Sequence, residues 1–190
     1  MFGRLALAAL VALGLIAAAP ATAEAATRNA LETASSRVTV TVSDQSGGVL
    51  PARAAARAWA KSGAITARFG NCAGPGCIVV RATETHTAGT CFYLTAGCAY
   101  RIPDGTCIVE VNRWVAAPDP YRSRWLALSV TTHEVGHCLG LPHLDPVTSI
   151  MHNPGSSTDP VRVPSAADLA YLRDVTAGRV AAFDPGTLAT

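Results

Sequence analysis

The segment HEVGHCLGLPH, residues 133–143, holds three of the chain's five histidines and constrains the fold more than any other feature. His133 and His137 are four residues apart, so on a helix both imidazoles project from one face. Residues 121–139 contain no proline and only one glycine. This predicts a helix that runs into the two histidines.

The residues after this helix predict a sharp exit. Gly140 can adopt the left-handed conformation that ends helices, and Pro142 follows shortly after it. A continued helix would carry His143 far from the other two histidines, so it must return on a loop. Three neutral imidazoles, from His133, His137 and His143, can then bind one ion and leave one position for water. That arrangement is typical of catalytic zinc.

Glu134 lies next to the first histidine in sequence but is rotated by about 100° around the helix. This position suits a general base that holds a zinc-bound water without binding the metal itself. The shorter pattern HExxH occurs by chance in many helices. The full pattern HExxHxxGxxH, with a helix before it and a Gly-Pro exit after it, is far more specific. A purely structural zinc site is disfavoured because only three ligands are evident.

The segment resembles the signature of the metzincin metallopeptidases, which continues into a methionine-containing turn. Ser149-Ile150-Met151-His152 resembles that Met-turn, and the resemblance implies that Met151 is a structural floor beneath the metal rather than a ligand. Small bacterial secreted proteases of the matrixin-like or snapalysin-like kind are the nearest relatives by this resemblance. It implies an α+β, zincin-type fold with a twisted mixed β-sheet, two helices including the active-site helix, and a small C-terminal lobe with one helix.

The N-terminus is expected to be a signal peptide over residues 1–25. Arg4 precedes an apolar run from Leu5 to Ala19, and small residues then offer a cleavage site. The run is shorter than the roughly 20 residues that span a membrane. Residues 26–37 form either a short pro-segment or a flexible N-terminus, and residues 38–190 form the metallopeptidase domain. We therefore expect a secreted, extracellular protein.

An even number of cysteines in an oxidising compartment predicts disulfides. Proximity in the sequence suggests that the six cysteines pair as Cys72–Cys77, Cys91–Cys98 and Cys107–Cys138. Many other pairings are compatible with the sequence alone. A zinc cluster is a weak alternative because the chain contains no CxxC pair.

Local patterns predict the remaining elements. Strands are expected at residues 37–43, 65–69, 77–83, 98–102 and 107–112, and helices at 51–62 and 165–175, in addition to the helix at 121–139. The metzincin resemblance implies that a substrate pairs with an edge strand, for which 98–102 is the best candidate. Trp59, Trp114 and Trp125 are expected to lie in the core.

Together these features predict a secreted zinc endopeptidase that hydrolyses peptide bonds through a zinc-activated water, with Glu134 as general base. The alternative is a secreted zinc-containing binding protein of the same fold with little or no turnover. The net charge of +2 argues against nucleic acid as a partner. We expect a monomer that acts on proteins or peptides and has no stable membrane association once the signal peptide is removed. One catalytic zinc ion is expected, whereas a structural calcium site cannot be read from the sequence.

Overall fold

The computed structural model describes residues 37–84, 96–116, 123–145, 147–152 and 163–186. Its elements are β1 (Val38–Asp44), α2 (Ala52–Ala60), β2 (Ile65–Phe69), β3 (Cys77–Thr83), β4 (Gly97–Arg101), β5 (Cys107–Asn112), the 3₁₀-helix η1 (Arg113–Ala116), α3 (Ser123–Cys138) and α4 (Ala166–Thr176). Every strand and α-helix predicted for these residues is present, with ends shifted by no more than two residues. The signal peptide predicted at 1–25 and the segment 26–36 lie outside the described residues.

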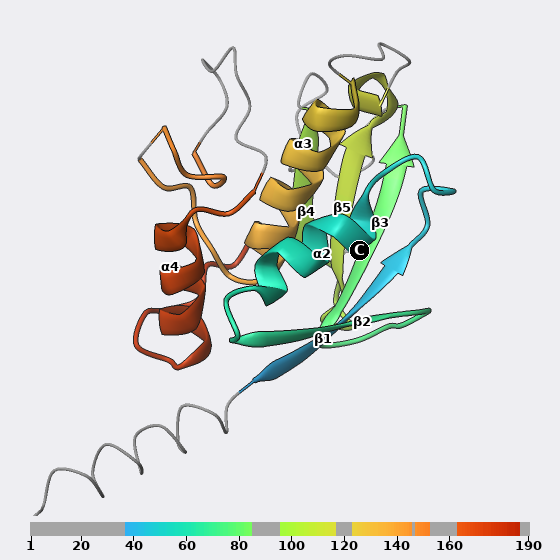
Figure 1. Ribbon diagram of the computed structural model, residues 1–190. Coiled ribbons are helices and arrows are strands. Elements are labelled where there is room, and N and C mark those ends of the chain that lie inside the picture. Colours follow the sequence, from blue (N-terminus) through green and yellow to red (C-terminus); the bar gives the residue numbers. More distant parts are fainter. Residues whose placement is uncertain (1–36, 85–95, 117–122, 146, 153–162, 187–190) are drawn as a thin grey trace, which may run out of the picture. The chain divides into compact units, whose positions relative to one another are not determined.

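The five strands form one mixed sheet in the order β2-β1-β3-β5-β4. The pairs β1–β2, β1–β3 and β3–β5 are parallel, whereas β4 runs antiparallel to β5 at the end of the sheet. Helices α2 and α3 pack side by side against one face, and α4 follows in the C-terminal part (Figure 1). The fold is therefore α+β, as predicted, and β4 is an edge strand of the described sheet.

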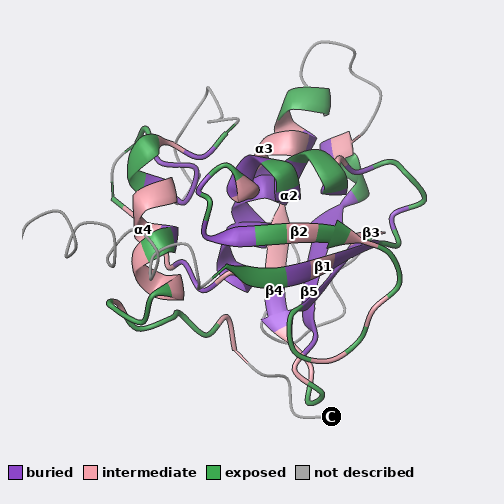
Figure 2. Ribbon diagram, turned by 60° about the horizontal axis from the view of Figure 1, so that its bottom comes forward, coloured by how far each residue is buried: buried purple, intermediate pink, exposed green. Residues whose placement is uncertain are grey.

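The core lies between the sheet and the helices α2 and α3. Alternate residues of the central strands point into it, and Val42, Val80 and Val109 are at most 2% exposed. Trp59 on α2 is fully buried, and its indole Nε1 donates a hydrogen bond of 2.8 Å to the carbonyl of Thr132 on α3. Figure 2 shows the buried residues on these strands and on the helices that cover them. This packing fixes α3, which carries the histidine motif, over the sheet.

The prediction that all three tryptophans lie in the core is wrong for two of them. Trp114 is 53% and Trp125 is 44% exposed. Trp114 belongs to the single turn η1, where only the neighbouring Val115 is turned inward and buried. Trp125 lies in the first turn of α3, at the end of the helix far from its buried middle.

Two of the suggested disulfides are present in the structure. Cys72–Cys77 joins the loop before β3 to its first residue, and Cys107–Cys138 joins the start of β5 to the last residue of α3. Cys98 is disulfide-bonded as well, and its suggested partner Cys91 lies outside the described residues. The Cys107–Cys138 bond holds the C-terminal end of α3 against the sheet, one residue after His137. Among the described helices, none is long and apolar enough to cross a membrane.

Candidate metal centre and active site

Helix α3 brings His133 and His137 together on one face. Their ring centroids are 4.7 Å apart, and their Nε2 atoms approach to 3.1 Å. Both side chains are buried, at 7% exposure each. As the sequence predicts, the spacing of four residues places both imidazoles on one face of the helix.

The exit of α3 returns the chain toward this pair. Gly140 has a φ of +92°, and its N–H bonds the carbonyl of His137, while the N–H of Leu141 bonds the carbonyl of Gly136. This is the hydrogen-bond pattern of a Schellman motif, in which the left-handed residue reverses the chain. The loop that follows brings Nε2 of His143 to 3.3 Å from Nε2 of His137. The three ligand atoms lie within 4.8 Å of one another.

Backbone carbonyls set the tautomer of the two helical histidines. Nδ1 of His133 lies 2.7 Å from the carbonyl oxygen of Ile150, and Nδ1 of His137 lies 2.8 Å from that of Leu141. A carbonyl can only accept, so each Nδ1 carries the proton and each Nε2 keeps its lone pair. The short Nε2–Nε2 contact between His133 and His137 is therefore not an N–H···N hydrogen bond. Nitrogens that share one tetrahedral zinc ion lie about 3.3–3.4 Å apart. The Nε2 separations of 3.1 Å for His133–His137 and 3.3 Å for His137–His143 are close to this value.

Burial keeps these imidazoles neutral. Loss of solvation, followed by repulsion from His137, lowers the pKa of His133 to about 3. Loss of solvation lowers the pKa of His137 to about 4, and it also lowers the pKa of the more exposed His143. Since only the neutral ring can bind a metal, all three side chains are ready to do so at neutral pH.

Glu134 points from α3 toward the edge strand β4. Its side chain is 7% exposed, and burial raises the pKa of its carboxyl to about 8. A Cβ atom placed on Gly97 of β4 would lie 2.6 Å from Cγ1 of Val130, 2.8 Å from Cγ of Glu134 and 2.9 Å from its Oε1. The missing side chain of Gly97 thus leaves the space that the glutamate occupies. The role of Gly97 could not be predicted from the sequence, because no local pattern links it to Glu134.

We expect Gly97→Ala to displace the side chains of Glu134 and Val130 on α3 while leaving the fold and the histidines in place. A shift of about 1 Å in a reacting group can lower kcat about 100-fold, and we expect a loss of about 10- to 100-fold. Steady-state kinetics with a peptide substrate would measure kcat and KM separately. The matched control is Gly70→Ala, because a Cβ at Gly70 meets nothing within 4 Å. An unchanged kcat in Gly97→Ala would show that this close approach has no part in catalysis.

Met151 lies beneath the histidine-bearing turn of α3. It is fully buried, and a Cβ atom on Gly136 would overlap its sulfur and come within 2.7 Å of Cζ2 of Trp59. The N–H of Leu144 donates to the Met151 carbonyl, which ties the loop after His143 to this turn. Met151 is thus part of the packing under the site, and Gly136 is the residue of the motif that makes room for it.

Asp168, which the sequence marks only as part of a helix cap, also supports the site. It is fully buried in α4 and forms a capping box with Ser165. Its carboxylate also accepts hydrogen bonds from Ser149 Oγ and from the backbone N–H of Ile150. The carbonyl of Ile150 holds Nδ1 of His133, so Asp168 fixes the peptide that orients a metal ligand. The cap has a local sequence signal, but the contact with the Met-turn has none.

We expect Asp168→Ala to weaken zinc binding about 10- to 100-fold, the usual cost of losing an outer partner of a metal ligand. It should also lower the free energy of unfolding by about 1–3 kcal/mol, because the buried groups of Ser149 and Ile150 lose their acceptor. Competition with a zinc chelator would measure the affinity. Asp174→Ala on the same helix is the control, because Asp174 makes only an exposed ion pair with Arg179. Equal zinc affinity in the two variants would contradict this role.

The chain is similar to known proteins. A family model described as matrixin matches residues 55–169. The archaemetzincin of Methanopyrus kandleri is 13% identical, with a TM-score of 0.49, over 73% of this chain and 95% of that one. The archaemetzincin of Archaeoglobus fulgidus, solved with malonate, is 14% identical, with a TM-score of 0.47, over 71% and 99%. No match was found among curated proteins. The matched region spans more than half of the chain and contains the whole histidine motif, so the protein belongs to the matrixin family of metzincin-type zinc metallopeptidases.

Proposed function

We propose that the protein is a secreted zinc endopeptidase in which His133, His137 and His143 hold the metal and Glu134 is the general base. The observation that supports this proposal is the arrangement of these four side chains. Three imidazole ligand atoms lie within 4.8 Å of one another, and a buried glutamate from the same helix lies against Gly97 of the edge strand. A protein that only binds zinc has no need for that carboxylate.

The residues of the chain divide the chemistry between them. When bound, zinc would supply an acidified water and polarise the carbonyl of the scissile bond. The positive charge of bound zinc would lower the pKa of Glu134 from the value of about 8 that burial alone gives it. A carboxylate oxygen of Glu134 would then accept the proton of the attacking water and deliver it to the departing amine nitrogen. The carbonyls of Ile150 and Leu141 would keep His133 and His137 in the required tautomer throughout.

A peptide substrate would bind in extended form along β4. One side of this strand pairs with β5, and the backbone groups of its other side can pair with an added strand. Glu134 lies directly against Gly97 on the same strand, so a peptide bound there would pass the general base. This supports proteins or peptides as the substrate class.

Cleavage-site profiling tests the proposal directly. The secreted protein, incubated with a library of peptides, should cleave internal peptide bonds, lose this activity with a zinc chelator and regain it with stoichiometric zinc. Bound zinc without cleavage of any peptide would instead favour the alternative, a binding protein of the same fold. Sequencing the N-terminus of the protein from the culture medium would test the removal of residues 1–25.

A further inference from the structure

The chain returns to the metal site after its last helix. The N–H of Phe183 donates a hydrogen bond of 2.8 Å to the carbonyl of Gly140, at the exit of α3. The Phe183 ring lies 5.4 Å from the His137 ring between centroids, and it remains 39% exposed. A Cβ atom on Gly140 would lie 3.0 Å from Cβ of Ala182, so the glycine also admits this segment. The segment 183–186 therefore lies beside a metal ligand.

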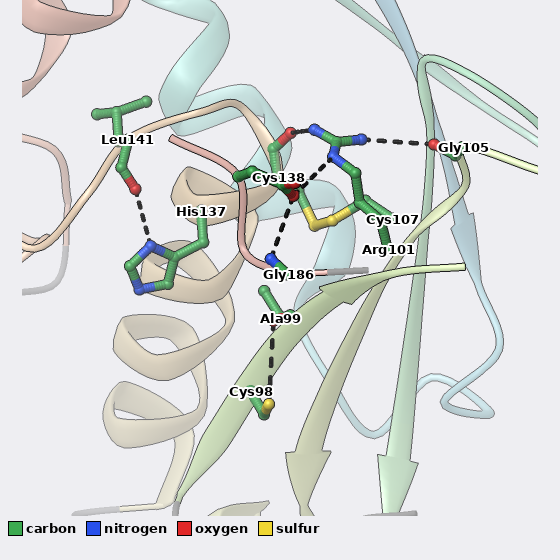
Figure 3. Close-up of a disulfide and its surroundings, with 10 residues drawn as sticks. Cys98, Ala99, Arg101, Gly105, Cys107, His137, Cys138, Leu141 and Gly186 are labelled. Carbon is green, nitrogen blue, oxygen red and sulfur yellow. Dashed lines mark hydrogen bonds and ion pairs between the residues drawn. A yellow bond between two sulfur atoms is a disulfide. The ribbon is translucent and has the colours of Figure 1, made fainter. Parts of the chain in front are cut away.

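The same segment then reaches the edge strand. The N–H of Arg101, the last residue of β4, donates a hydrogen bond of 2.9 Å to the carbonyl of Gly186. The Arg101 side chain lies 4.0 Å from the carboxylate of Asp184 and donates a hydrogen bond of 3.0 Å to the carbonyl of Cys138. Figure 3 shows Gly186 beside Arg101, with Cys138 and His137 on the neighbouring helix. One arginine thus joins the C-terminal segment, the edge strand and the end of α3.

The contact lies on the side of β4 that faces away from the sheet. The N–H of Ile102 bonds Thr106, and the carbonyl of Ala96 accepts from Asn112, so these residues face β5. Neighbouring residues of a strand alternate, which turns the backbone groups of Gly97, Ala99 and Arg101 outward. Gly186 therefore occupies the outer edge at Arg101.

Nearer to Glu134, no described residue pairs with the outer edge. Within the described residues, the N–H groups of Gly97 and Ala99 have no hydrogen-bond partner. The sulfur of Cys98 lies 4.0 Å from the carbonyl of Ala99 (Figure 3), but a disulfide-bonded sulfur has no proton to donate. A bound peptide can therefore pair with Gly97 and Ala99 and would meet the C-terminal segment at Arg101.

We propose that residues 183–186 close one end of the substrate-binding edge and limit how far a substrate extends on that side. This inference rests on the proposed peptidase function. Glu134 places the scissile bond near Gly97, and Arg101 is four positions along the strand, about 13 Å away. A peptide antiparallel to β4, the more stable pairing, directs its N-terminal side toward Arg101. The enzyme then accepts about three paired residues before the scissile bond.

Two truncated chains test this limit. The test chain ends at Ala182 and lacks the segment, whereas the matched control ends at Gly186 and keeps it. Peptides are lengthened by one residue at a time on the N-terminal side, and kcat/KM is measured for each. For the full chain and the control, kcat/KM should stop rising after about three residues. For the chain ending at Ala182, two further backbone hydrogen bonds should raise it about tenfold.

A continued rise in the full chain, or the same plateau in the chain ending at Ala182, would overturn the proposal. If that chain does not fold, the double variant Phe183→Ala with Asp184→Asn loosens the segment and should show the same gain. The exchange of the Arg101 amide hydrogen supplies a readout that needs no activity. It should be slow in the full chain and the control, and fast in either test variant.

The proposed peptidase function and the proposed limit on substrate length can be refuted independently. Absence of cleavage in every chain would refute the function. In that case, calorimetric binding of the same peptides to Glu134→Gln chains with and without the segment decides the limit. If the segment closes the edge, the affinity of the chain that keeps it should not change with peptide length beyond about three residues. If the segment leaves the edge open, this affinity should still depend on peptide length.

Discussion

Glu134→Gln should lower kcat/KM for peptide cleavage by about 10²- to 10⁴-fold while the protein keeps its zinc. The amide has nearly the shape of the carboxyl but cannot accept the proton of the attacking water. His133 and His137 are unaffected, since the carbonyls of Ile150 and Leu141 orient their rings and Glu134 does not. Kinetics with a quenched peptide and elemental analysis of the same sample would measure both effects.

The control is Glu84→Gln, because the Glu84 carboxylate is largely exposed in an ion pair with Arg113 at the end of β3. This variant should cleave as the parent does. Full activity in Glu134→Gln would refute the general-base role, even if zinc remained essential. Loss of zinc together with activity would mean that Glu134 acts on the metal site instead, and the two measurements separate these results.

The parts of the fold that have local signals could be predicted from the sequence. The strands are short runs rich in β-branched residues, with glycines and prolines in several of the connections, and the predicted ends agree with the structure to within two residues. Burial does not alternate in all of them, because β5 and most of β3 are buried on both faces. The turn at Gly140 followed from the left-handed conformation that glycine adopts readily, and the structure has it there. The convergence of the three histidines followed from the helical period and from this turn.

The supporting contacts could not be predicted, because each joins residues that are far apart in the chain. Gly97 and Glu134 meet across β4 and α3, and nothing in either neighbourhood indicates the other. Asp168 has a cap signal, but its bonds to the Met-turn depend on how α4 packs. The contact between Gly186 and Arg101 depends on the path of a segment without regular structure. A sequence signature therefore predicts the reacting residues more readily than it predicts the residues that position them.

Zinc removal should inactivate the protein and destabilise it without unfolding it. Zinc that binds only the folded state stabilises it by about 4 kcal/mol when free zinc is about a thousandfold above its dissociation constant. A chelator should remove this contribution and lower the melting temperature. His133 and His137 do not depend on the ion for their placement, because Ile150 and Leu141 hold their rings and Cys107–Cys138 fastens the end of the helix.

Calorimetry and circular dichroism of the chelated protein would measure these effects, and added zinc should restore both stability and cleavage. His137→Ala should behave like the chelated protein and should not respond to zinc, because it lacks the ligand that lies closest to both others. Loss of the helical signal on chelation would show that the site forms only around the metal. A melting temperature that the chelator leaves unchanged would show that no zinc is bound. If the carbonyl contacts form the site before zinc binds, the chelated protein should stay folded, lose activity and regain it when zinc is added.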